Sequence, residues 1–147
     1  MNNLEIRTIN ESANPLPDYA TIGASGMDIR AAVEAEITLK PMERKLVPTG
    51  LFMQIPLGFE AQVRPRSGLA VNKGITCLNT PGTIDSDYRG EIKVLLINLS
   101  TEEQTIKPGD RIAQIVFVKI ELAIITLVQQ LDLTERATGG FGHTGIN

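Results

Sequence analysis

The sequence predicts a single all-β domain of the sandwich, jelly-roll or barrel type. Its 147 residues are enough for one domain with a hydrophobic core and too few for a second domain of ordinary size. Apolar residues alternate with polar ones or form short β-branched runs, as they do in strands. Pro and Gly interrupt these runs at short intervals, and many short strands separated in this way are typical of all-β folds.

The clearest single strand is predicted over 59–64. Phe59, Ala61 and Val63 alternate there with polar neighbours, which is the pattern of a strand with one buried face. Longer apolar runs rich in β-branched residues predict strands that are covered on both faces, and these lie at 94–97, 112–120 and 122–128.

One helix is predicted, over 67–73. Ser67 is a potential N-cap, and Gly74 can close the C-terminal end. Between the strands, Pro presets φ and Gly tolerates positive φ, so turns are predicted at 47–50, 55–58, 80–82 and 107–110.

The segment 82–90 places two carboxylates and a phenol between two glycines. On a strand, Asp85 and Asp87 would share one face. A carboxylate in that position can act as a general base or help to hold a metal ion. The alternative is an Asx-turn that leads into a hairpin before the 91–99 run, because Asp, Ser and Gly are ordinary turn residues.

A candidate anion site begins at the end of the 59–64 strand. Arg64 and Arg66 are expected on one face, and Ser67 and Gly68 follow at the helix start, where backbone N–H groups are free. The alternative is an N-cap serine beside solvated arginines. The Gly-x-x-x-x-Gly-Lys-Ser/Thr pattern is absent, which excludes a P-loop at this position.

Three other polar residues have ordinary interpretations when taken singly. Asp28 is typical of a turn or edge carboxylate, Arg111 of an ion-pair partner, and Gln114 of a surface strand residue. Cys77 is the only cysteine, so an internal disulfide is impossible, and its apolar and small neighbours indicate a buried small side chain rather than a nucleophile.

The C-terminal segment 137–147 is rich in glycine and is expected to be mobile in the absence of a ligand. It nevertheless contains Phe141. An aromatic side chain in such a segment can stack on a flat ring, so the segment is expected to close over a ligand as a lid.

The charge balance limits the partners. With 14 basic and 17 acidic residues the formal net charge is -3, which argues against general attraction to nucleic acid or to an anionic membrane. No apolar run approaches the length of a membrane span, and the N-terminal residues lack the pattern of a secretory signal. We therefore expect a soluble protein of a reducing compartment, the cytoplasm.

Five segments taken together resemble the trimeric dUTP pyrophosphatases (dUTPases). One such motif would be weak, but here five occur in order over nearly the whole chain: SGMDIRA at 25–31, RPRSGLA at 64–70, GTIDSDYRGE at 82–91, GDRIAQ at 109–114 and RATGGFGHTG at 136–145. The resemblance implies a jelly-roll (β-clip) subunit over 1–136, with 137–147 as the lid. It also implies a homotrimer whose active sites lie at the subunit interfaces.

The resemblance implies hydrolysis of dUTP to dUMP and pyrophosphate, which keeps uracil out of DNA and supplies dUMP for dTMP synthesis. Asp85 would be the base that takes a proton from the water attacking the α-phosphorus. The α- and β-phosphates would be held by Arg66, Ser67 and Gly68. Mg²⁺ would sit on the triphosphate, with Asp28 and Gln114 reached through its water shell.

The resemblance also implies a uracil pocket in the hairpin from Asn79 to Tyr88. Asn79 and backbone groups near Thr83, Ile84 and Lys93 would read the uracil edge, and Tyr88 would pack under the deoxyribose and exclude a 2′-hydroxyl. At the other end of the nucleotide, Arg136 would approach the γ-phosphate, and Phe141 would stack on uracil.

Two alternatives are open. A dCTP deaminase shares the fold and parts of the second and third motifs, but its chemistry needs a glutamate where this chain has Leu95, and it lacks the glycine-rich fifth motif. A non-enzymatic binding or regulatory module would keep the fold without the chemistry. The presence of Asp85, Ser67 and Tyr88 argues against a module of that kind.

Overall fold

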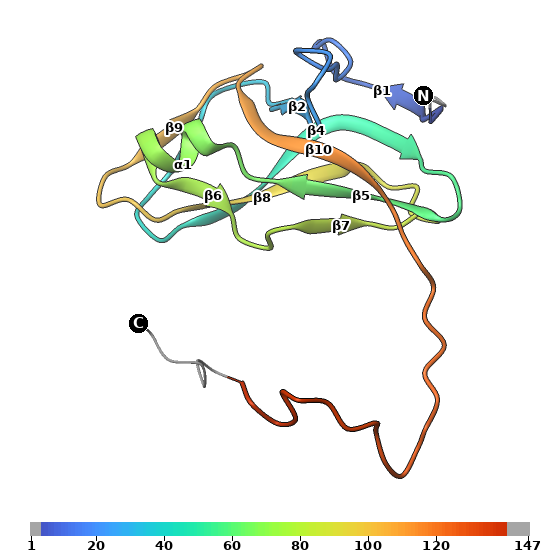
Figure 1. The fold of residues 1–147 in the computed structure, drawn as a ribbon. Helices are drawn as coiled ribbons and strands as arrows, with labels where there is room; N and C mark the ends of the chain where they lie inside the picture. Colours follow the sequence, from blue (N-terminus) through green and yellow to red (C-terminus); the bar gives the residue numbers. More distant parts are fainter. Residues whose placement is uncertain (1–3, 141–147) are drawn as a thin grey trace.

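The computed structural model describes residues 4–140, and two four-stranded sheets face one another across its core (Figure 1). The first sheet has the order β1-β4-β8-β6, with β1 at Arg7–Asn10, β4 at Arg44–Gln54, β8 at Ile92–Asn98 and β6 at Ile75–Cys77. The second has the order β2-β10-β5-β7, with β2 at Met27–Arg30, β10 at Arg111–Lys119, β5 at Phe59–Arg64 and β7 at Gly82–Ile84. A two-stranded sheet pairs β3 (Ile37–Leu39) with β9 (Gln104–Ile106), and all pairings are antiparallel.

The core lies between the two large sheets and consists of inward-facing apolar side chains from both. Burial of each large aliphatic side chain contributes about 1.5–3 kcal/mol. The fully buried ones include Ile29, Val47, Ile92, Val94, Leu96, Ile112 and Ile115. The all-β prediction is confirmed. Three predicted strands are also confirmed, because β5 spans 59–64, β8 contains 94–97, and β10 covers nearly all of 112–120.

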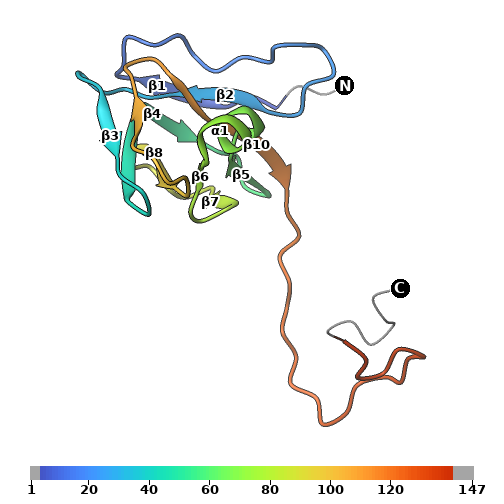
Figure 2. The same cartoon turned by 90° about the vertical axis from the view of Figure 1, so that its left-hand side faces the viewer.

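The predicted strand at 122–128 is wrong. The chain leaves the sandwich after Lys119 and extends away from it (Figures 1 and 2), and residues 121–138 are exposed. Apolar side chains such as Leu127, which is 98% exposed, are not covered by residues 4–140. The apolar, β-branched pattern of 122–128 is that of a segment buried by other residues. Such a pattern does not specify whether those residues belong to the same chain or to another.

The turn predicted at 47–50 is also wrong, because β4 continues through it. The pairing of β4 with β8 shifts register between Pro48 and Leu51, and Gly50 has a φ of 68°. The segment is therefore a β-bulge, which bends a strand without ending it. The predicted turns at 55–58 and 107–110 are confirmed, and a bend at 78–81 precedes β7.

The hairpin expected between Asn79 and Tyr88 does not form. β6 and β8 belong to one sheet, whereas β7 between them pairs with β5 in the other. The chain therefore crosses the sandwich twice in this stretch. The residues after β7 thereby share a hollow with the start of β8.

The helix α1 spans Ser67–Lys73 as predicted, and Gly74 closes it in the left-handed conformation with a φ of 62°. The predicted cap is wrong. Arg66 is the N-cap residue, with extended backbone and no capping side chain, so Ser67 is the first helical residue. Its hydroxyl is consequently not used for capping.

Among the helices that the structure describes, none has both the length and the apolar character needed to cross a membrane.

Candidate active site

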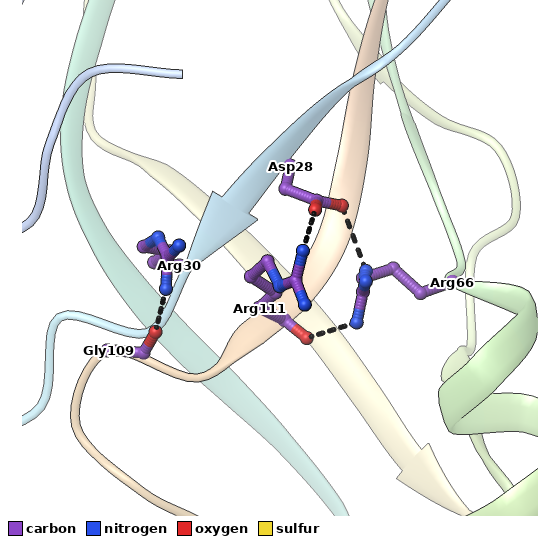
Figure 3. Close-up of polar contacts among 5 residues, drawn as sticks. All are labelled: Asp28, Arg30, Arg66, Gly109 and Arg111. Atoms are coloured by element: carbon purple, nitrogen blue, oxygen red, sulfur yellow. Dashed lines mark hydrogen bonds and ion pairs between the residues drawn. The ribbon is translucent and has the colours of Figure 1, made fainter. Parts of the chain in front are cut away.

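The first cluster of polar side chains is centred on Asp28, on the edge strand β2 (Figure 3). Its Oδ1 accepts a hydrogen bond from Arg66 Nε at 2.9 Å, and its Oδ2 accepts one from Arg111 Nη1 at 3.1 Å. Arg66 Nη1 also donates to the Arg111 carbonyl oxygen at 3.3 Å. The Asp28 side chain is 22% exposed, so the three charges lie at the surface of the sandwich.

Strand register places Gln114 beside Asp28. Gln114 on β10 is paired with Asp28 on one side and with Arg64 on the other, so residues far apart in sequence share one row of the sheet. Arg30 Nη1 donates to the Gly109 carbonyl oxygen at 2.8 Å and holds the turn that precedes β10 (Figure 3). Two guanidinium groups facing one carboxylate leave an excess positive charge, which suits an anionic ligand.

Arg64 and Arg66, which were expected on one face, have different partners. The Arg64 guanidinium donates twice to Gln62 Oε1, at 3.1 and 2.7 Å, whereas Arg66 joins Asp28. The second guanidinium group beside Asp28 is that of Arg111, not that of Arg64. The exposed residues Ser67 and Gly68 follow Arg66 directly, at the start of α1.

A second group of side chains surrounds a hollow of about 250 Å³ between β4, β7 and β8. Its lining contains most residues predicted for the base, sugar and catalytic roles, namely Thr83, Ile84, Asp85, Tyr88 and Lys93. Two residues that were not predicted, Leu46 and Glu91, complete the lining. Glu91 stands in the third motif, which is a signal that could have found it, whereas no sequence feature distinguishes Leu46.

Asp85 follows the last residue of β7 and begins a turn, in which the Tyr88 N–H donates to the Asp85 carbonyl oxygen at 3.2 Å. The strand-face argument for Asp85 and Asp87 is therefore wrong. The Asx-turn alternative is wrong as well, because within residues 4–140 this turn is closed by a backbone carbonyl and not by an aspartate side chain. Asp85 lines the hollow, and Asp87 does not.

Two further predicted residues, Asn79 and Arg136, lie outside these two groups. The Asn79 amide lies over Gly82, where an added Cβ would be 3.2 Å from Asn79 Nδ2. Arg136 Nε donates to the Gly139 carbonyl oxygen within the exposed C-terminal segment. Phe141 lies outside the described residues.

The described part of the chain contains no cluster of three or more His, Cys, Asp or Glu side chains that could bind a metal ion by themselves. Cys77 is buried, and burial raises its pKa to about 11. The burial confirms the prediction that Cys77 is a small side chain of the core.

The two groups of residues are far apart within one chain. In the pairing of β5 with β7, Ala61 faces Ile84, so Asp85 is at the level of Glu60. Arg66 lies farther along the same strand direction, about 20 Å from that level at roughly 3.3 Å per residue. Within one chain, Asp85 and Arg66 therefore lie toward opposite ends of β5.

Comparison with known proteins agrees with the five motifs. Residues 12–145 match the family model described as dUTPase. The deoxyuridine 5'-triphosphate nucleotidohydrolase of Finegoldia magna is 58% identical over 97% of this chain and 99% of its own length. That of Fusobacterium nucleatum is 57% identical over 99% of each chain. The chain belongs to the dUTPase family.

Solved dUTPase structures share the fold at low sequence identity. A Staphylococcus bacteriophage 80alpha dUTPase with dUPNHPP has a TM-score of 0.84 at 23% identity, over 97% of this chain and 99% of its own. A mutant dUTPase from phage phi11 of S. aureus, described with a structural Mg(II) ion, has a TM-score of 0.77 at 22% identity, over 90% and 100%. The jelly-roll-like prediction for this dUTPase is confirmed.

Proposed function

We propose that the protein hydrolyses dUTP to dUMP and pyrophosphate. The observation that carries the proposal is the hollow shared by Asp85, Tyr88, Thr83 and Lys93, in a chain that belongs to the dUTPase family. This activity removes a precursor of uracil in DNA and supplies dUMP for dTMP synthesis.

The reaction needs one base and one water molecule. Asp85 accepts a proton from the water, whose oxygen forms a bond to the α-phosphorus, while the bond from that phosphorus to the bridging oxygen of the β-phosphate breaks. Pyrophosphate leaves with the electron pair, in line with the attack, and no covalent enzyme intermediate forms. The turn closed by Tyr88 fixes the backbone of Asp85 for this role.

The phosphates are bound by Arg66, the Ser67 hydroxyl and the backbone of Gly68, with Arg136 at the γ-phosphate. An incoming phosphate competes with Asp28 for Arg66, while Arg111 keeps its own bond to that carboxylate. Because Ser67 does not cap α1, its hydroxyl can donate to a phosphate oxygen.

The oxygen ligands near the proposed phosphate site suit a Mg²⁺ ion that is held mainly by the triphosphate. A single carboxylate, Asp28, and the Gln114 amide stand side by side on paired strands, too few to bind Mg²⁺ directly but suited to contact its water shell. When bound on the triphosphate, Mg²⁺ would neutralise negative charge on the phosphate oxygens.

The uracil edge is read by Asn79 and by backbone groups near Thr83, Ile84 and Lys93. Cytosine is rejected because its amino group would face a donor, and an unpaired buried polar group costs about 1–3 kcal/mol. Phe141 closes the pocket by stacking on the base.

The distance between Asp85 and Arg66 supports an active site built from more than one chain. Since a single substrate must reach both, Asp85 of one subunit serves the phosphate site of another. A homotrimer satisfies this requirement for three sites at once.

The exposed segment 122–133 supports the same assembly. It carries large apolar side chains that the described part of its own chain leaves exposed. The sandwich offers an apolar groove of about 910 Å³ whose lining includes Leu4, Leu16, Phe59 and Phe117. The segment of one subunit covers apolar surface of its neighbour, which buries both.

The deaminase alternative is weaker. Leu95 on β8 pairs with Leu46 on β4, and Leu46 lines the hollow. The position where deamination needs a proton-transferring glutamate therefore carries an aliphatic side chain. Incubation with dUTP, dCTP and UTP in the presence of Mg²⁺, followed by separation of the products, tests the assignment. Pyrophosphate and dUMP from dUTP are expected, and ammonia from dCTP would overturn the proposal.

Removal of residues 137–147 by truncation after Arg136 is expected to lower turnover about 10- to 100-fold, because stacking of an aromatic side chain on a base contributes about 1–3 kcal/mol. Sedimentation should show that assembly is retained, because segment 122–133 is still present. Phe141→Ala in the full chain should reproduce most of the loss. An unchanged rate after truncation would contradict the lid.

Replacing Tyr88 by alanine is expected to admit UTP. The ring fills the space that a 2′-hydroxyl would need, so its loss should lower the ratio of kcat/KM for dUTP to that for UTP by at least about tenfold. Steady-state pyrophosphate release with each nucleotide measures this ratio. Continued exclusion of UTP would assign sugar discrimination to another residue.

A further inference from the structure

The Tyr88 ring is folded back over the chain that follows it. Its hydroxyl donates to the Glu91 carbonyl oxygen at 3.0 Å, which ties the far end of the side chain to the start of β8. The residue is 44% exposed and lines the hollow, so the ring keeps one accessible side.

Gly90 provides the space in which the ring lies. A Cβ added to Gly90 would be 2.6 Å from Tyr88 Cζ and 3.0 Å from Cε2, and closer still to the hydroxyl oxygen. Gly90 is not among the glycines with positive φ, so its backbone conformation does not require glycine. The absence of a side chain at this position therefore serves the ring.

The carbonyl that receives the phenol is itself firmly held. Glu91 Oε1 accepts hydrogen bonds from the N–H groups of Thr49 and Gly50, at 3.1 and 2.9 Å, in the bulge of β4. Thr49 is 1% exposed, and its hydroxyl donates to the Ile92 carbonyl oxygen at 2.5 Å. Glu91 Oε2 also lies 3.4 Å from Lys93 Nζ.

We propose that Gly90 is a positioning residue for sugar recognition. Gly90 and the Glu91 carbonyl form a seat that sets the height of the Tyr88 ring below the deoxyribose, and this seat determines how strictly a 2′-hydroxyl is excluded. The inference rests on the proposed dUTP hydrolysis. It makes discrimination a property of two residues rather than of the tyrosine alone.

A double-mutant cycle tests the seat, with Gly90→Ala, Tyr88→Ala and the combined variant. The measured quantity is the ratio of kcat/KM for dUTP to that for UTP. Gly90→Ala alone is expected to lower the ratio at least about tenfold, because the added methyl group displaces the ring. Added to Tyr88→Ala, it should change the ratio less than about twofold, because no ring is left to displace.

Gly23→Ala is the matched control, since an added Cβ there meets nothing within 4 Å. It should leave both the ratio and the rate unchanged. An unchanged ratio in Gly90→Ala, or an equal loss with and without the ring, would overturn the seat. A wild-type chain that does not hydrolyse dUTP would instead overturn the proposed function.

Thermal unfolding gives a readout that does not need activity. Gly90→Ala is expected to lower Tm in the chain that carries Tyr88 and to have a much smaller effect in the Tyr88→Ala chain. If Gly90→Ala does not fold, recovery of folding in the combined variant supports the clash. Failure of the combined variant to fold would overturn the proposal.

Discussion

Replacing Asp85 by asparagine is expected to lower dUTP turnover by about 10² to 10⁴ while nucleotide binding is retained, because a positioned general base contributes a factor of that order. The amide has nearly the same shape as the carboxylate, so the hollow keeps its form but cannot accept the proton of the water. Single-turnover pyrophosphate release measures the rate. Calorimetric titration with dUpNHpp measures binding.

Asp87→Asn is the matched control, since it makes the same change in the same turn at a residue that does not line the hollow. Its rate should be close to that of the unchanged protein. Near-normal turnover in Asp85→Asn, or an equal loss in both variants, would contradict the role of Asp85 as the base.

Mixing two inactive variants is expected to restore activity. Arg66→Ala removes a phosphate contact, and Asp85→Asn removes the base, so each variant alone should be impaired by at least about 10². If one site takes Arg66 and Asp85 from different subunits, random mixed trimers from equal amounts contain both native residues in about a quarter of their sites. Activity assays after co-expression or joint refolding measure the recovery.

The control is a chain that carries both substitutions, mixed in equal amounts with the unchanged chain. Sites built across subunits should again give about a quarter of full activity, whereas sites built within one chain should give about half. Mixed single variants that stay inactive, together with half activity in the control, would show that Arg66 and Asp85 act within one chain. That result would contradict the proposed assembly.

The strands at 59–64 and 112–120 could be predicted because alternation and β-branched runs are local properties of the sequence. The bulge at 47–50 could not. Pro and Gly indicate that the backbone bends, but only the Glu91 carboxylate, far along the chain, satisfies the N–H groups of Thr49 and Gly50 so that pairing can continue.

The site was predictable in its parts and not in its arrangement. Thr83, Ile84 and Asp85 are neighbours in sequence and necessarily lie together. The pairing of Asp28 with Arg66 and Arg111 depends on the register of three strands, which local patterns do not specify. The contact of Arg64 is local instead, because its guanidinium donates to Gln62 two residues earlier on the same strand.

The apolar segment 122–133 also affects how much working protein a cell can maintain. A newly made chain presents side chains such as Ile124 and Leu127, exposed by 92% and 98%, on an unprotected extended backbone that proteases and chaperones recognise. In the proposed assembly the segment is concealed, and such an assembly depends on chain concentration. The abundance of active protein should therefore rise more steeply than synthesis when expression is low, since chains that meet no partner are degraded.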